Sequence, residues 1–230
     1  MEKKISSLEK KIGIKFNNND LLRQAVVHRS YLNEHTSFEL NHNERLEFLG
    51  DAVLELVVTE HLFLNYENPE GELTNWRASL VCGKMLAQIS QKIKLEDYLY
   101  LSKGESKDLG KARQYILANA MEAVIGAIYL DQGWDSAKEF INTFILNELP
   151  NILKHKLYLD PKSSFQEIAQ EKAGITPSYK VLSETGPDHE KTFEIGLFLK
   201  SDLIATGTGS SKQEAQEDAA TNALELDKWK

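Results

Sequence analysis

Four carboxylates recur at helical spacing in a stretch that otherwise consists largely of apolar residues and glycine. On an α-helix Glu44, Glu47 and Asp51 fall within an arc of about 60°. Glu55 extends this row by one turn. Ionised carboxylates in a protein core are costly unless they are paired or bind a metal ion. Arg45 points to another side of the helix and is poorly placed to neutralise both Glu47 and Asp51. The pattern therefore predicts a buried helix whose acids need a cation from outside it.

A second apolar stretch carries a matching polar face. Between residues 117 and 130 the strongly polar side chains are Asn119 and Glu122, which lie three residues apart and thus on one side of a helix. If the two polar faces pack together, three carboxylates and one amide form a cluster of oxygen donors without His or Cys. Such a cluster suits Mg²⁺ or Mn²⁺ and disfavours zinc.

Structural explanations compete with this predicted metal site. Glu44 could be an ordinary first-turn acid behind an Asn43 cap, and Glu55 could reach solvent. The cluster could also be a buried, hydrogen-bonded polar network without a metal ion. Arg77, further along the chain, could pair with the acids or contact a phosphate. Spacing alone leaves these alternatives open.

These side chains must be positioned by a helical part of the chain that extends to about residue 154. A break at residues 68–71 ends the helix that carries the first acids, and Thr74 is the predicted cap of the next helix. Apolar residues recur at helical spacing in six stretches, at residues 8–14, 19–30, 44–65, 76–93, 112–132 and 135–154.

The pattern changes after residues 155–160, which we interpret as a linker. Residues 161–173 have helical spacing and end at Gly174, a common helix stop. Three strand-like runs follow at residues 178–183, 192–200 and 203–208. Ser210 and Ser211 then cap a final helix with an alanine-rich face. The sequence therefore predicts an all-α domain at residues 1–154 and an α-β-β-β-α domain at residues 161–230.

Composition sets broad limits. The chain has 230 residues, of which 41% are hydrophobic and 27% charged, as is typical of a globular protein. The absence of a span-length apolar run or an apolar leader predicts a cytoplasmic protein without membrane contact. The single cysteine, Cys82, excludes an internal disulfide and a multi-cysteine zinc site. The net charge of −8 argues against a generic nucleic-acid binder, so any such function must rest on local motifs.

Several motifs resemble those of bacterial ribonuclease III, and together they cover essentially the whole chain. The family signature is resembled by Asn43-Glu44-Arg45-Leu46-Glu47-Phe48-Leu49-Gly50-Asp51, and two further family segments by residues 70–74 and 122–130. The carboxy-terminal part resembles a double-stranded-RNA-binding domain through residues 162–167, 186–189 and 207–212.

The resemblance implies a homodimeric endonuclease that hydrolyses both strands of double-stranded RNA with Mg²⁺, or Mn²⁺ in its place. It would leave 5′-phosphate and 3′-hydroxyl ends and process ribosomal and messenger RNA. Asp51 and Glu122 would be catalytic, and Glu47, Asn119 and Glu122 would bind the metal. Glu44 and Glu70 would be supporting acids. The RNA duplex would be contacted by Ser163, Gln166, Glu167, His189 and Lys212, in the minor groove and at the phosphates.

The sequence departs from the family pattern at two places, and each departure predicts a change in metal or RNA binding. Asn119 stands where many members have an aspartate, so we expect an active enzyme with somewhat weaker Mg²⁺ affinity. Lys212 is followed by Gln213 and Glu214 instead of further lysines, so we expect weak, salt-sensitive RNA binding by the isolated domain. The alternative from a different class is a non-catalytic protein that binds duplex RNA.

Overall fold

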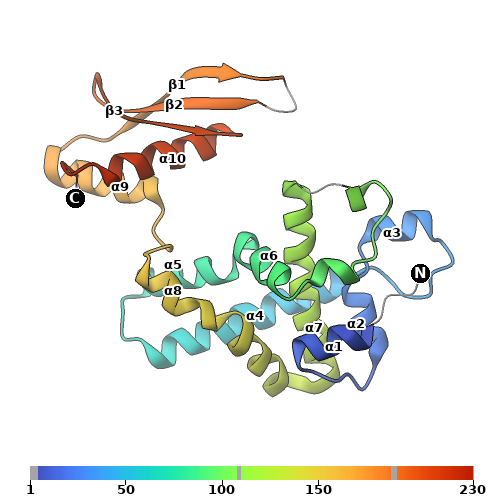
Figure 1. Ribbon diagram of the computed structural model, residues 1–230. Coiled ribbons are helices and arrows are strands. Elements are labelled where there is room, and N and C mark those ends of the chain that lie inside the picture. Colours follow the sequence, from blue (N-terminus) through green and yellow to red (C-terminus); the bar gives the residue numbers. More distant parts are fainter. Residues whose placement is uncertain (1–4, 108–109, 188–190, 230) are drawn as a thin grey trace. The chain divides into compact units, whose positions relative to one another are not determined.

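The computed structural model describes residues 5–107, 110–187 and 191–229, which form two compact units, Met1–Tyr158 and Leu159–Lys230. We describe each unit by itself (Figure 1). The first unit is helical, as the sequence predicts. Its elements are α1 (Ile5–Ile12), α2 (Asn19–Ala25), α3 (Arg29–Glu34), α4 (Glu44–Asn65), α5 (Glu70–Val81), α6 (Gly83–Lys92), the short 3₁₀ helices Leu95–Tyr98, Glu105–Lys107 and Leu146–Glu148, α7 (Lys111–Phe144) and α8 (Leu149–Lys154).

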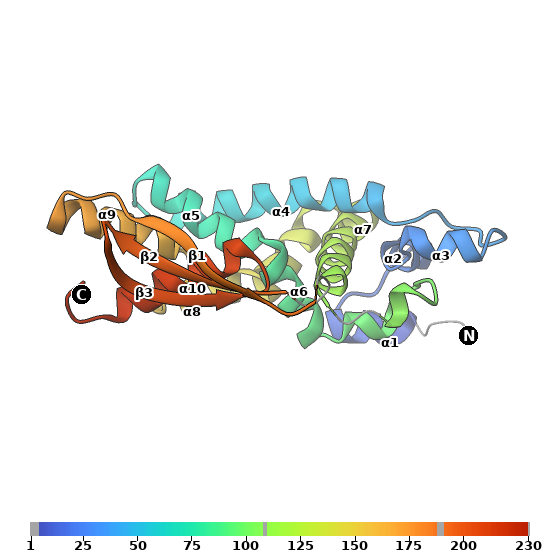
Figure 2. The same ribbon diagram turned by 90° about the horizontal axis from the view of Figure 1, so that it is seen from above.

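The crossing of α4 and α7 organises the first unit (Figure 2). The two backbones touch at Gly50 and Gly126. A β-carbon added at Gly50 would lie 1.7 Å from the carbonyl oxygen of Glu122, and one added at Gly126 would lie 2.2 Å from the carbonyl oxygen of Leu46. Small residues are therefore required at this crossing, and the close approach sets the distance between the polar faces of the two helices.

Our prediction that α4 is buried all round was wrong, because one side of the helix is open. Phe48 is 81% exposed, Phe63 76% and Leu56 57%, while Val57 and Leu54 on the opposite side are fully buried. Phe48, Ala52, Leu56 and Phe63 are spaced by four, four and seven residues and share one side of the helix. We call these four residues the α4 apolar face. The hydrophobicity of a helix face predicts that the face will be buried, but it does not say whether the same subunit or another molecule buries it.

Local capping also differs from expectation. Thr74 does not start a helix: α5 already begins at Glu70, and the Thr74 hydroxyl donates a hydrogen bond to the Glu70 carboxylate. The stretch predicted as one helix to residue 93 is broken between α5 and α6. Asn43 precedes α4 but makes no side-chain cap, because its amide donates to the carbonyl of Ala25 instead.

The second unit has the predicted α-β-β-β-α order. Helix α9 (Pro161–Ala173) is followed by strands β1 (Ser178–Thr185), β2 (Thr192–Leu199) and β3 (Asp202–Gly209), and by α10 (Lys212–Glu225). The strands form an antiparallel sheet in the order β1-β2-β3, and both helices lie on the same face of it (Figure 1). Between sheet and helices lies a core of Phe165, Ala169, Leu197, Leu199, Ala219, Ala220, Ala223 and Trp229.

In the part of the chain that the structure describes, no helix combines the length and apolar character that crossing a membrane requires.

Candidate active site

The structure brings together the two polar faces that the sequence pairs. The Asn119 side chain on α7 hydrogen-bonds to the Glu47 carboxylate on α4. Glu122, one turn further along α7, is close enough to Asp51 and Glu47 for both charges to raise its pKa. Gly50 lies between the α4 acids, and its contact with the Glu122 backbone holds the two helices at this distance. Four side chains from two helices thus form one oxygen-rich cluster.

The electrostatics of the cluster show an excess of negative charge. Burial, followed by the charges of Asp51 and Glu47, raises the pKa of Glu122 to about 7. The pKa of Glu47 is also raised, by burial and by the charge of Glu44, although the hydrogen bond from Asn119 opposes this shift. Among the described residues, no Lys, Arg or His forms an ion pair with Glu47, Asp51 or Glu122. The described part of the chain therefore supplies these three acids with no cationic partner.

The cluster is open to solvent on one side. From Ala118 to Ile128, Asn119 and Glu122 are the α7 residues that are not fully buried, and Asp51 is exposed. All three side chains are therefore at least partly accessible to solvent. This accessibility argues against a sealed polar network, which the sequence alone had left open.

The chemistry of these oxygen donors fits a hard divalent cation, although their side chains do not converge on one position where a cation could sit. Within the described ranges, no group of three His, Cys, Asp or Glu side chains has a geometry that could hold a metal ion. The cluster depends on an amide oxygen from Asn119, and the neighbouring carboxylates repel each other. All of its donors are oxygens, the kind that Mg²⁺ and Mn²⁺ accept. A cation would have to pull the carboxylates together against that repulsion.

The two acids predicted to play supporting roles lie in different places. Glu44 adjoins the cluster, where its carboxylate lies 3.6 Å from Arg29 and 3.7 Å from the Nδ1 atom of His42. Glu70 is not brought into the cluster. It is exposed at the start of α5 and lines a hollow of about 600 Å³ at the far end of α4, together with Leu62, Phe63, Tyr66 and Leu73.

Arg77 has a partner that spacing could not identify. Its Nε atom lies 3.0 Å from the Glu55 carboxylate, and its Nη1 atom donates to the Thr59 hydroxyl at 3.0 Å. The pair joins α5 to α4 and leaves Glu47 and Asp51 unneutralised. The pair also accounts for Glu55, the acid at the end of the row.

In the second unit, the residues predicted to contact RNA lie on α9 and α10, except for His189, which lies outside the described residues. Gln166 and Glu167 are exposed on α9. Ser163 is exposed too, but its hydroxyl donates to Asp160, the residue that caps α9. Lys212, at the start of α10, lies 3.4 Å from the Glu184 carboxylate, so a phosphate would have to displace that partner.

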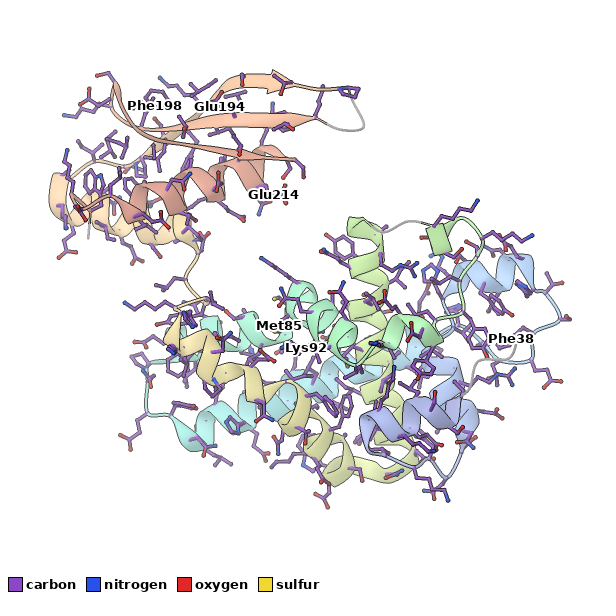
Figure 3. All side chains as sticks on the ribbon, viewed as in Figure 1. Phe38, Met85, Lys92, Glu194, Phe198 and Glu214 are labelled. Atoms are coloured by element: carbon purple, nitrogen blue, oxygen red, sulfur yellow. The ribbon has the colours of Figure 1, made fainter. Side chains whose placement is uncertain are left out.

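Two acids of α10 have structural roles that sequence reasoning missed. The carboxylate of Glu214, labelled in Figure 3, accepts a hydrogen bond from the backbone of Ser210, and the Ser211 hydroxyl accepts one from the backbone of Glu214. Ser211 is thus the N-cap of α10, and Glu214 also holds the residue before the cap. Asp218 accepts a hydrogen bond from the backbone of Thr208 on β3. These acids fix α10 against the sheet, which accounts for part of the acidic character of the helix.

Comparisons with known proteins agree with this architecture. A ribonuclease-III-like family model matches residues 18–149, and a model of the double-stranded RNA binding motif matches residues 161–226. Proteins named Ribonuclease 3 from Carboxydothermus hydrogenoformans and Clostridium acetobutylicum are 45% and 43% identical, over 96% and 97% of this chain and 94% and 96% of their own. The nuclease domain of ribonuclease III from Campylobacter jejuni is 39% identical with a TM-score of 0.57, covering 64% of this chain and 99% of that domain. The chain therefore belongs to the ribonuclease III family, and it is an endoribonuclease of that type whose second unit is a double-stranded RNA binding motif.

Proposed function

We propose that this enzyme hydrolyses phosphodiester bonds in both strands of an RNA duplex with the help of Mg²⁺, leaving 5′-phosphate and 3′-hydroxyl ends. The observation that carries the proposal is the state of Glu122, whose pKa is raised to about 7 between two further carboxylates that have no cationic partner among the residues that the structure describes. Such an arrangement is costly for the protein and is relieved by a divalent cation.

Glu47, Asn119 and Glu122 would hold the ion, with Mn²⁺ able to substitute. A bound ion of this kind makes a coordinated water more acidic and offsets negative charge on the phosphate. Asp51, exposed beside Glu122, would orient the attacking water and accept its proton. Asn119 holds the Glu47 carboxylate in place through its hydrogen bond. Glu44 would support this arrangement from the edge of the cluster.

The α4 apolar face supports a homodimer as the working form. Phe48, directly after Glu47 in the chain, is 81% exposed, and Phe63 lies beside the hollow that Glu70 lines. An exposed apolar strip next to an active site is costly in a monomer and typical of an interface. A second copy docked on this strip would bring two sites together, one for each RNA strand. Glu70 would then lie at the interface as a supporting acid.

Phe48→Glu is expected to weaken self-association by about 10-fold or more, because a large apolar side chain contributes roughly 1.5–3 kcal/mol on burial. Analytical ultracentrifugation over a range of concentrations measures the change. The thermal stability of the separated subunit should stay close to that of wild type, since Phe48 is exposed there. Leu203→Glu, at an exposed apolar residue of the second unit, serves as the control. Equal association of Phe48→Glu and wild type would contradict a dimer through this face.

The cleavage proposal is tested with a long RNA duplex labelled at each 5′ end, incubated with purified protein in Mg²⁺, in Mn²⁺ and in EDTA. Cleavage is expected with either metal and not in EDTA. Product ends are checked with a phosphatase and with poly(A) polymerase, which requires a 3′-hydroxyl. Products with 3′-phosphates, or undiminished cleavage in EDTA, would refute the proposed chemistry. In the cell, we expect folded regions of ribosomal and messenger RNA in the cytoplasm to be the substrates.

Asn119→Asp is expected to lower the Mg²⁺ concentration required for half-maximal cleavage several-fold, because a carboxylate adds one negative charge to the ligand set. The measurement is the cleavage rate as a function of Mg²⁺ concentration for both proteins. The maximal rates should remain within about an order of magnitude, since Glu47, Asp51 and Glu122 are unchanged. An unchanged Mg²⁺ requirement would show that residue 119 does not contribute to the metal site, and a higher one would contradict the expected effect of the added charge.

A further inference from the structure

A stripe of accessible side chains on α7 extends beyond the acidic cluster. Asn119 and Glu122 follow Tyr115 by four and seven residues, so the three lie within an arc of about 60° on the helix. Residues between them in the sequence that point to other sides of the helix, such as Leu117 and Ala120, are fully buried. Tyr115 therefore continues the line of the active site by one turn towards the start of α7.

Tyr115 has no evident structural task within its own subunit. It is 69% exposed, and in the described part of the chain its hydroxyl has no hydrogen-bond partner. The other tyrosines of the first unit differ in this respect. They are buried or pack against the core, as is the case for Tyr31, Tyr66, Tyr98, Tyr100, Tyr129 and Tyr158. An aromatic side chain left exposed on the same stripe as the acids is placed to meet the substrate.

The direction of the side chain indicates which part of the substrate it meets. Side chains on an α-helix lean towards the helix N-terminus, so Tyr115 leans away from Asn119 and lies beside the acidic cluster rather than over it. It would therefore reach a nucleotide adjacent to the scissile phosphate. A phenol is neutral and both donates and accepts a hydrogen bond, which matches a hydroxyl group on the substrate. In an RNA duplex the 2′-hydroxyls are displayed in the wide minor groove and distinguish RNA from DNA.

We propose that the Tyr115 hydroxyl hydrogen-bonds to a ribose 2′-hydroxyl of the cleaved strand, next to the scissile phosphate, and so contributes to the selection of RNA at that nucleotide. The inference rests on the proposed function, because it requires the RNA backbone to pass over Asn119 and Glu122. Tyr115 is then a specificity-determining residue outside the metal site.

The test combines a change in the enzyme with a change in the substrate. Duplexes carrying a single 2′-deoxy nucleotide at each position around one cleavage site are cut by wild type and by Tyr115→Phe, and kcat/KM is measured. For wild type we expect a loss of roughly 2–10-fold at one position, the size of a single hydrogen bond. On the all-ribose duplex, Tyr115→Phe should show the same loss relative to wild type. On the duplex with the 2′-deoxy nucleotide at that position, Tyr115→Phe should lose no further activity, since both changes remove the same contact.

Tyr129→Phe is the matched control, because it removes a phenol hydroxyl from the same helix at a side chain that packs against the core. It should keep the wild-type response to every 2′-deoxy substitution. If Tyr115→Phe cuts the all-ribose duplex as fast as wild type, or loses activity yet still responds to the 2′-deoxy substitution, the inference is overturned while the proposed function stands. A wild type that does not cut the all-ribose duplex in Mg²⁺ overturns the proposed function and this inference with it.

Discussion

Replacing Glu122 by Gln is expected to reduce duplex cleavage by about 10³-fold or more and, without metal, to make the protein more stable above pH 7. The loss of activity is expected because the amide removes a charged group from the proposed metal site, and metal-assisted stabilisation of a transition state is worth several kcal/mol. The gain in stability follows because Gln resembles the protonated acid and removes a buried negative charge that lies between Asp51 and Glu47.

The pH dependence of this stability difference has a definite sign. The pKa of Glu122 is raised from 4.5 to about 7 in the folded protein, so between these values the folded state binds more protons than the unfolded state. Metal-free wild type should therefore lose stability as the pH rises from about 4.5 through 7. Glu122→Gln should lack this decline, so that the two proteins are similar near pH 4.5 and diverge by pH 8. Thermal melts across this range measure the difference.

Adding Mg²⁺ tests Glu122 in the opposite direction, because a cation should stabilise the charged carboxylate that destabilises the metal-free protein. If Mg²⁺ binds the folded carboxylates as proposed, then at pH 8 the ion should raise the melting temperature of wild type and should raise that of Glu122→Gln much less. Glu139→Gln, at an exposed acid of α7 beyond the non-helical Gly133, is the control and should resemble wild type in activity and melting. Full cleavage by Glu122→Gln would remove this residue from the proposed active site.

Gly50→Ala is expected to destabilise the first unit by about 3 kcal/mol or more and to abolish duplex cleavage. The added methyl group would lie 1.7 Å from a backbone oxygen of α7, and a backbone cannot move aside as a flexible side chain can. Any relief must separate α4 from α7 and thereby pull Glu122 away from Glu47 and Asp51. Urea unfolding measures the stability, and duplex cleavage below the unfolding transition measures the activity.

Gly71→Ala is the matched control for this prediction. Gly71 lies in the first turn of α5, where an added β-carbon would meet no atom within 4 Å. The same substitution there should be neutral or stabilise the protein by roughly 0.5–1 kcal/mol, because alanine has less conformational freedom to lose. If both variants were equally stable, the backbone contact at the α4–α7 crossing would not be as tight as described.

The sequence predicted the proximity of the two polar faces better than their surroundings. Spacings of three and four residues place Glu47 with Asp51, and Asn119 with Glu122, on any α-helix, and buried polar groups need partners, so the pairing of the two faces followed. The sequence did not identify the partner of Arg77, because that partner depends on how α5 lies against α4. The open side of α4 was missed because an apolar residue such as Phe48 has the same appearance in sequence whether its neighbours cover it or not.

The helices and strands of the second unit were predicted to within two residues, because their ends have local causes. Asp160 and Ser211 cap the two helices through their own side chains, and Gly174 adopts the left-handed conformation that ends α9. The break between α5 and α6 was missed, since Cys82 carries no such signal and only Gly83 marks the place. The hydrogen bonds of Glu214 and Asp218 also escaped notice, because acids on a polar helix face suggest solvent rather than caps.

The crossing at Gly50 and Gly126 also affects when the enzyme can become active during its synthesis. Glu47 and Asp51 leave the ribosome about 70 residues before Glu122. Until α7 has emerged and docked on α4, the growing chain holds only half of the oxygen cluster. Nuclease activity is thereby tied to completion of the helical unit, because a truncated chain that ends before α7 lacks half of the proposed site.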